Sequence, residues 1–136
     1  LEKNKQHFPP NVPYLCTAKG IHVGTHQLMS QVISTILGDN HQLAYLSGPS
    51  FAKEMLANHP IGVVVASESL EVAKKVSTLL RSQRLKIYIT KDVIGVEIGG
   101  ALKNPLAIGA GMIRGLGMGE STLALLGYCL AGPFWC

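Results

Sequence analysis

Residues 92–119 read DVIGVEIGGALKNPLAIGAGMIRGLGMG, and this stretch decides how the chain is organised. Nearly every residue from Val93 to Ile113 is apolar or small, and this composition predicts a helix buried on nearly all sides. The helix nevertheless carries Glu97 and Lys103. At about 100° per residue, the helix face around Lys103 holds mostly small side chains.

Two interpretations of Lys103 stay open from these residues alone. Small neighbours let a ligand or another backbone approach the ammonium group closely, which favours a functional site. Alternatively, Gly99 and Gly100 serve tight helix packing, and the lysine extends its charged end into water. Pro105, two residues on, either bends the helix because it has no amide hydrogen to donate, or marks the first turn of a new helix.

Composition limits the classes of function. The 136 residues are 47% hydrophobic and 15% charged, as expected for a folded domain with a real core. The net charge of +4 comes from scattered lysines and arginines without interleaved aromatics, so we expect no nucleic-acid binding, whereas small anionic substrates are compatible. The three cysteines suit neither a disulfide framework nor a metal site and indicate a reducing compartment. We expect no membrane span, because no run of about 20 apolar residues is present.

Apolar periodicity predicts alternating strands and helices before residue 92. Strands are expected at 14–17, 43–47, 61–66 and 85–90, and helices at 27–37, 50–55 and 70–80. Gly38 is expected to cap the helix 27–37. This order predicts an α/β layer followed by a helical segment. We place a domain boundary near Lys91 and Asp92, which gives an α/β portion at 1–91 and a helical portion at 92–136.

Two positions before that boundary are candidates for ligand binding. Lys19 follows the strand 14–17, and ligands of open α/β sheets gather at the carboxyl ends of the strands, although the lysine could simply end the strand. Gly48 and Ser50 form a turn before a short helix, where backbone amides suit a phosphate. His22 and His26 lack a third ligand, so we predict no metal site. Neither GxGxxG nor a P-loop is present in the sequence.

Five segments occur in a recognisable order: YLCTAKGI, LSGPSFAKE, VVVAS, DVIGVEIGGALKNPLAIGAGMIRGLGMG and ST-x-A-x-L. Together, over about residues 13–125, they resemble the NAD(P)-dependent glycerol-3-phosphate dehydrogenases. The resemblance implies the C-terminal part of a Rossmann-type parallel sheet, followed by the start of an all-α helical domain like that of 6-phosphogluconate dehydrogenase. The implied activity is that of an oxidoreductase, which transfers hydride between NAD or NADP and the pair dihydroxyacetone phosphate and sn-glycerol 3-phosphate.

The resemblance also implies roles for single residues. Lys103 matches the family's acid/base lysine, and Lys19 matches a lysine that contacts both cofactor and substrate, so both lysines are expected to be catalytic. Gly48 and Ser50 match positions that contact substrate, and Ala52 matches one that contacts cofactor. Charge builds up on the carbonyl oxygen during hydride transfer, and an ammonium group can supply the required proton. We expect Lys19, Gly48 and Lys103 to share one cleft.

The sequence departs from the family pattern in several places. The family's cofactor glycines, a later aspartate and an Arg-Asn pair are missing, Pro105 stands where valine is common, and 127–136 (GYCLAGPFWC) looks like an unrelated ending. We therefore expect this chain to be a piece of an enzyme. The resemblance implies that the whole enzyme is a homodimer in the cytoplasm, with a plastid as the alternative location. Two other functions stay open: an inactive truncated product acting as an interaction module, and a related two-domain oxidoreductase with another substrate. The choice of NAD or NADP also stays open.

Overall fold

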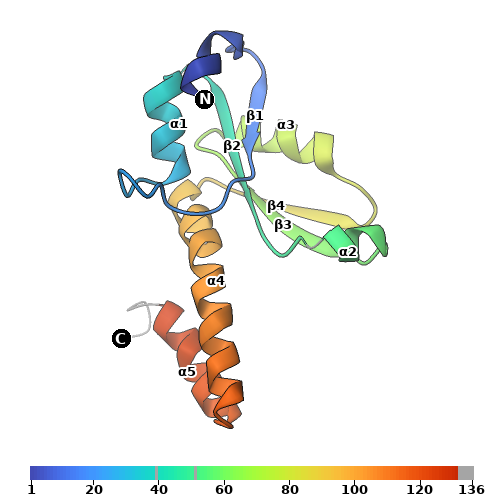
Figure 1. Ribbon diagram of the computed structural model, residues 1–136. Coiled ribbons are helices and arrows are strands. Elements are labelled where there is room, and N and C mark those ends of the chain that lie inside the picture. Colours follow the sequence, from blue (N-terminus) through green and yellow to red (C-terminus); the bar gives the residue numbers. More distant parts are fainter. Residues whose placement is uncertain (39, 51, 132–136) are drawn as a thin grey trace. The chain divides into compact units, whose positions relative to one another are not determined.

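The computed structural model describes residues 1–38, 40–50 and 52–131 (Figure 1). They form a 3-10 helix and alternating strands and helices, in the order η1 (Glu2–His7), β1 (Pro13–Cys16), α1 (Met29–Leu37), β2 (Gln42–Ser47), α2 (Ala52–Leu56), β3 (Ile61–Ala66), α3 (Leu70–Leu80), β4 (Leu85–Thr90), α4 (Val93–Gly115) and α5 (Glu120–Ala131). Every strand and helix predicted before residue 92 is present, and its ends lie within two residues of the expected positions.

The chain divides into two compact units between Ala101 and Leu102, inside α4. The first unit holds the sheet with its helices and the first turns of α4, and the second unit holds the remainder of α4 and α5. Within the second unit the two helices lie close at Gly109, where an added Cβ would be 3.5 Å from the Leu126 side chain. The domain boundary expected near residues 91 and 92 stays a prediction.

The four strands form one sheet in the order β1-β2-β3-β4, which confirms the α/β class. One detail of the expected parallel sheet was wrong: β1–β2 and β3–β4 are parallel, but β2–β3 is antiparallel, with Tyr45 opposite Ala66. The connection between β2 and β3 explains the reversal. A parallel crossover must return the chain over a strand of about 20 Å. Helix α2 has five residues and spans only ~7.5 Å.

Two apolar cores lie on opposite faces of the sheet, because successive strand residues point to opposite sides. On one face, α1 and the start of α4 pack on β2 and β3 through Ile33, Leu37, Tyr45, Ala66 and Val93. On the other face α3 packs through Ala44, Val65, Val72, Ala73 and Val76. Figure 1 shows α1 and α3 on different sides of the strands. Gly38 caps α1 as predicted, with a φ of +84°.

Helix α4 is continuous through Pro105, so no new helix begins there. Its amino end is capped by Asp92, whose Oδ1 accepts a hydrogen bond of 2.8 Å from the Gly95 amide. The expectation that this helix is buried on nearly all sides was wrong. Val93 is its buried residue, whereas Ile94 and Ile108 are 58% and 64% exposed, because among the described residues only its first turns pack on the sheet core and only one side of its later part packs on α5.

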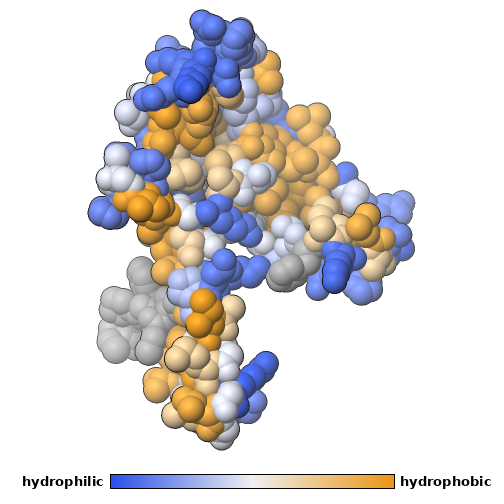
Figure 2. Space-filling model, viewed as in Figure 1, coloured by the Kyte–Doolittle hydropathy of each residue, from blue (hydrophilic) through white to orange (hydrophobic). Residues whose placement is uncertain are grey.

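Figure 2 shows apolar atoms at the surface of this helical segment. No helix in the described part of the chain is both long enough and apolar enough to cross a bilayer.

Candidate functional site

Lys19 lies three residues after β1, at the edge of the sheet where the parallel strands β1 and β2 both end. Its Nζ donates a hydrogen bond of 3.1 Å to the carbonyl oxygen of Gly48, which directly follows β2. The structure therefore brings together two of the three residues that were expected to share a cleft. An ammonium group has three N–H donors, so the exposed Lys19 keeps donors for an anionic ligand while Gly48 holds it in place.

Gly48 forms a turn that no other residue could form without strain. Its φ is +141°, in the region that residues with a side chain rarely adopt. A Cβ at this position would also lie 3.0 Å from Val63 Cα and 3.1 Å from the Gly62 oxygen, both backbone atoms of β3. The glycine thus lets the chain leave β2 closely packed against β3 and point its carbonyl at Lys19.

Helix α4 approaches the same strand ends at Gly100. A Cβ there would lie 2.8 Å from Ser47 Oγ and 3.8 Å from Lys19 Cγ, whereas a Cβ at Gly99 would meet nothing within 4 Å. Only one of the two glycines therefore serves close packing in the described structure. A narrow crevice results, lined by Cys16, Ala18, Lys19, Gly20, Tyr45, Leu46, Ser47, Val96, Glu97 and Gly100.

Glu97 also lines this crevice, and sequence reasoning gave it no role. Its carboxylate accepts hydrogen bonds from both the backbone amide of Ser30, at 2.9 Å, and the Ser30 hydroxyl. Ser30 lies in the first turn of α1, 67 residues earlier. The sequence did contain a signal for such a contact, a carboxylate in the middle of an apolar helix, because a partly buried carboxylate needs hydrogen-bond partners.

Two acidic side chains near Glu97, the Cys16 thiol and the Tyr45 phenol, have raised pKa values. Burial raises the pKa of the Cys16 thiol, the Ala18 amide lowers it, and the charge of Glu97 raises it again. Burial, followed by the charge of Glu97, raises the pKa of Tyr45 far above its usual range. Both groups therefore stay neutral around neutral pH, and Cys16 is not a reactive thiolate.

The other predicted site residues lie on nearby elements or in the second unit. Ser50 and Ala52 are exposed around the start of α2, and Phe51 between them lies outside the described residues. Lys103 lies on α4 in the second unit and is partly buried. The roles assigned to Lys103, Ser50 and Ala52 stay predictions.

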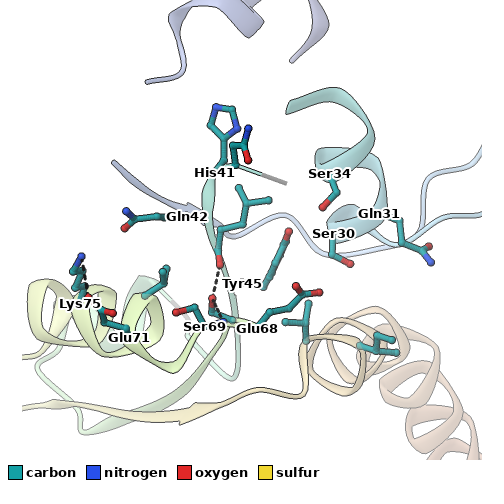
Figure 3. Close-up of a pocket in the computed structure, with 16 residues that line it drawn as sticks. Ser30, Gln31, Ser34, His41, Gln42, Tyr45, Glu68, Ser69, Glu71 and Lys75 are labelled. Carbon is teal, nitrogen blue, oxygen red and sulfur yellow. Dashed lines mark hydrogen bonds and ion pairs between the residues drawn. The ribbon is translucent and has the colours of Figure 1, made fainter. Parts of the chain in front are cut away.

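A larger cavity of about 710 Å³ lies at the opposite edge of the sheet, between α1, the start of β2 and the start of α3 (Figure 3). Part of its polar lining makes structural contacts: Ser67 Oγ donates to the Leu43 carbonyl at 2.7 Å, and Lys75 pairs with Glu71 at 3.5 Å, whereas His41 Nδ1 and Gln42 Oε1 are buried without a hydrogen-bond partner among the described residues. His41 Nε2 donates to the Phe8 carbonyl oxygen, 3.1 Å away. The predicted site residues Lys19 and Gly48 lie together at the other edge, so the site is expected there.

A lysine held at the carboxyl ends of parallel strands, in an α/β layer that leads into a long apolar helix, indicates part of a ligand-binding α/β protein of the Rossmann type. Two family models identify which one. Residues 1–92 match the NAD-dependent glycerol-3-phosphate dehydrogenase N-terminus, and residues 92–129 match the C-terminus of the same family. The chain belongs to the NAD-dependent glycerol-3-phosphate dehydrogenase family.

Individual relatives agree with this assignment. The glycerol-3-phosphate dehydrogenase [NAD(P)+] of Leptospira biflexa is 46% identical over 128 residues, which cover 93% of this chain and 38% of the relative. The chloroplastic NAD(+) enzyme of rice is 43% identical and is covered over 29% of its length. The crystal structure of the Coxiella burnetii glycerol-3-phosphate dehydrogenase superposes with a TM-score of 0.81 at 35% identity, over 92% of this chain and 38% of that one. The chain thus spans about a third of the length of these proteins.

Proposed function

We propose that this chain supplies the lysine-bearing part of the substrate site of an enzyme that interconverts dihydroxyacetone phosphate and sn-glycerol 3-phosphate with NAD(H) or NADP(H). One observation carries the proposal: the Lys19 ammonium group is fixed on the Gly48 carbonyl at the carboxyl ends of β1 and β2. The match of both parts of the chain to one dehydrogenase family supports it.

The residues at this edge fit a nicotinamide cofactor, which supplies or accepts the hydride when bound. Lys19 is exposed and keeps hydrogen-bond donors for a ligand. We assign cofactor contacts to Lys19 and Ala52, and substrate contacts to Lys19, Gly48 and Ser50, following the family resemblance.

Lys103 is the proposed acid/base. As the carbonyl carbon of dihydroxyacetone phosphate gains hydride, the C=O π bond breaks and negative charge develops on the oxygen. The Lys103 ammonium group donates a proton to that oxygen, and in the reverse direction the neutral amine removes it. Lys19 contributes positive charge close to the anionic substrate, which favours binding and stabilises the developing charge.

Replacement of Lys103 by methionine in the whole enzyme that carries this segment tests the proposal. Methionine keeps an unbranched apolar stem but removes the proton donor, so kcat for NADH oxidation with dihydroxyacetone phosphate should fall by about 10²- to 10⁴-fold. Lys74→Met is the matched control, because Lys74 is exposed on α3, on the other face of the sheet. A Lys103→Met enzyme with the kcat of the control would refute the assignment.

Two further properties of the whole enzyme stay predictions. We infer a homodimer from the family resemblance, and light scattering of the purified enzyme tests it. We infer a cytoplasmic location, with a plastid as the alternative, since the rice relative is described as chloroplastic. Microscopy of a tagged whole protein separates the two locations.

A further inference from the structure

The contact between Glu97 and Ser30 joins two helices that are distant in sequence. Both carboxylate oxygens of Glu97 are used: Oε1 accepts from the Ser30 amide at 2.9 Å, and Oε2 accepts from the Ser30 hydroxyl. Both residues are partly buried, so the bonds are shielded from water. A bidentate, charge-assisted contact of this kind fixes both distance and orientation.

The chemistry of a helix start explains why a carboxylate suits this place. Ser30 is the second residue of α1, and amides in the first turn of a helix have no acceptor within the helix. The partial positive charge at that end also favours an anion. Nearby, Gln31 Oε1 accepts a hydrogen bond from the Leu28 amide at 3.0 Å. That bond leaves the Ser30 amide without an acceptor, and Glu97 supplies one.

Three consecutive contacts define how the start of α4 lies on the first unit. Val96 packs against the core under α1, Glu97 binds Ser30, and Gly100 lies against Ser47 at the end of β2. Residues 96, 97 and 100 lie on one side of a helix within little more than one turn. Rotation of α4 by one residue would break the carboxylate contact, and in the direction that puts Ala101 in place of Gly100 it would also bring a side chain against Ser47.

We propose that Glu97 is a positioning residue, whose carboxylate locks the rotation and height of α4 against the ends of β1 and β2. This inference rests on the proposed function, because the same helix carries Lys103 one turn after Gly100. In this proposal Glu97 contacts neither substrate nor cofactor, and its effect on Lys103 passes through the helix. A shift of about 1 Å in a reacting group can cost about 100-fold in rate, so a small movement of α4 is enough to matter.

The test compares variants of the whole enzyme. Glu97→Gln keeps the shape but removes the charge and replaces one acceptor oxygen by a donor group. It should lower kcat by about 10- to 100-fold while KM for dihydroxyacetone phosphate changes less than threefold. Ser30→Ala removes the hydroxyl donor and leaves the amide, so it should produce a smaller effect in the same direction and also serves if Glu97→Gln does not fold. Glu71→Gln is the matched control, an exposed carboxylate on α3 paired with Lys75, and should leave kcat unchanged.

A double variant separates positioning from a purely structural role. If Glu97 acts through Lys103, Glu97→Gln should lower kcat much less in a Lys103→Met enzyme than in the parent, because the two changes remove the same function. Fully additive losses, or a normal kcat in both Glu97→Gln and Ser30→Ala, would overturn the inference. Failure of the proposed function looks different, since Lys103→Met alone would then keep its activity.

Discussion

Replacement of Gly48 by alanine should destabilise the chain through two separate effects. The backbone φ of +141° costs an alanine about 1–3 kcal/mol. The added Cβ would lie 3.0 Å from Val63 Cα and 3.1 Å from the Gly62 oxygen. Because these are backbone atoms of a central strand, the turn and β3 must move apart, which adds about 1–3 kcal/mol. We therefore expect Gly48→Ala to lower the free energy of unfolding by about 2–6 kcal/mol.

Gly38→Ala is the control that isolates the packing effect. Gly38 also has a positive φ, of +84°, but a Cβ there would meet nothing within 4 Å. It should therefore cost only the backbone strain of about 1–3 kcal/mol. Urea unfolding of the chain, followed by circular dichroism, measures both variants against the parent. If Gly48→Ala is no more destabilising than Gly38→Ala, the close contact between the turn and β3 does not constrain the fold, and the reasoning is refuted.

Two further predictions concern the crevice beside Lys19. Gly99→Ala should stabilise α4 by up to about 1 kcal/mol, because alanine favours a helix and a Cβ there meets nothing within 4 Å. Gly100→Ala should not be stabilising, because its Cβ would crowd Ser47 Oγ, and it should become stabilising when Ser47 is also replaced by alanine. Equal unfolding midpoints for Gly99→Ala and Gly100→Ala would contradict this. Burial and the charge of Glu97 raise the pKa of Tyr45, so above pH ~10 the folded state keeps a phenol proton that the unfolded state loses. The free energy of unfolding should therefore fall as the pH rises beyond that value, by at most about 1.4 kcal/mol per pH unit. Tyr45→Phe should flatten the fall in urea titrations between neutral and alkaline pH, and an unchanged slope would exclude the phenol as its source.

The elements could be predicted from the sequence, but the direction of one strand could not. The run IGVVVA at 61–66 and the amphipathic pattern at 70–80 identify a buried strand and a helix packed on a sheet. A continuous run of β-branched residues has the same pattern read in either direction, so it carries no sign of the antiparallel pairing with β2. That pairing depends on the length of α2 and on the tight turn at Gly48, which are properties of the connection.

Part of the site could be predicted for an equally specific reason. Lys19 and Gly48 each follow a strand, and parallel neighbours bring their carboxyl ends together, so the sequence order was sufficient to expect their proximity. The contacts of Glu97 and Gly100 could not be predicted, because they depend on partners that lie 67 and 53 residues earlier in the chain. The burial of α4 was overestimated because the apolar pattern indicates a need for partners without saying where they lie.

The antiparallel pair also explains why the proposed site lies at one edge of the sheet. Strands β1 and β2 end at the Lys19 edge, and β3, which runs against β2, ends at the opposite edge, where Ser67 and the start of α3 make structural contacts. Because β4 is parallel to β3, the chain leaves the sheet at that opposite edge and enters α4. From Val93 to Gly100 the helix rises ~10 Å, enough to pass Tyr45 and reach the end of β2. In a wholly parallel sheet α4 would begin at the Lys19 edge and run away from it, whereas here its second turn passes over the site and Glu97 can fix it there.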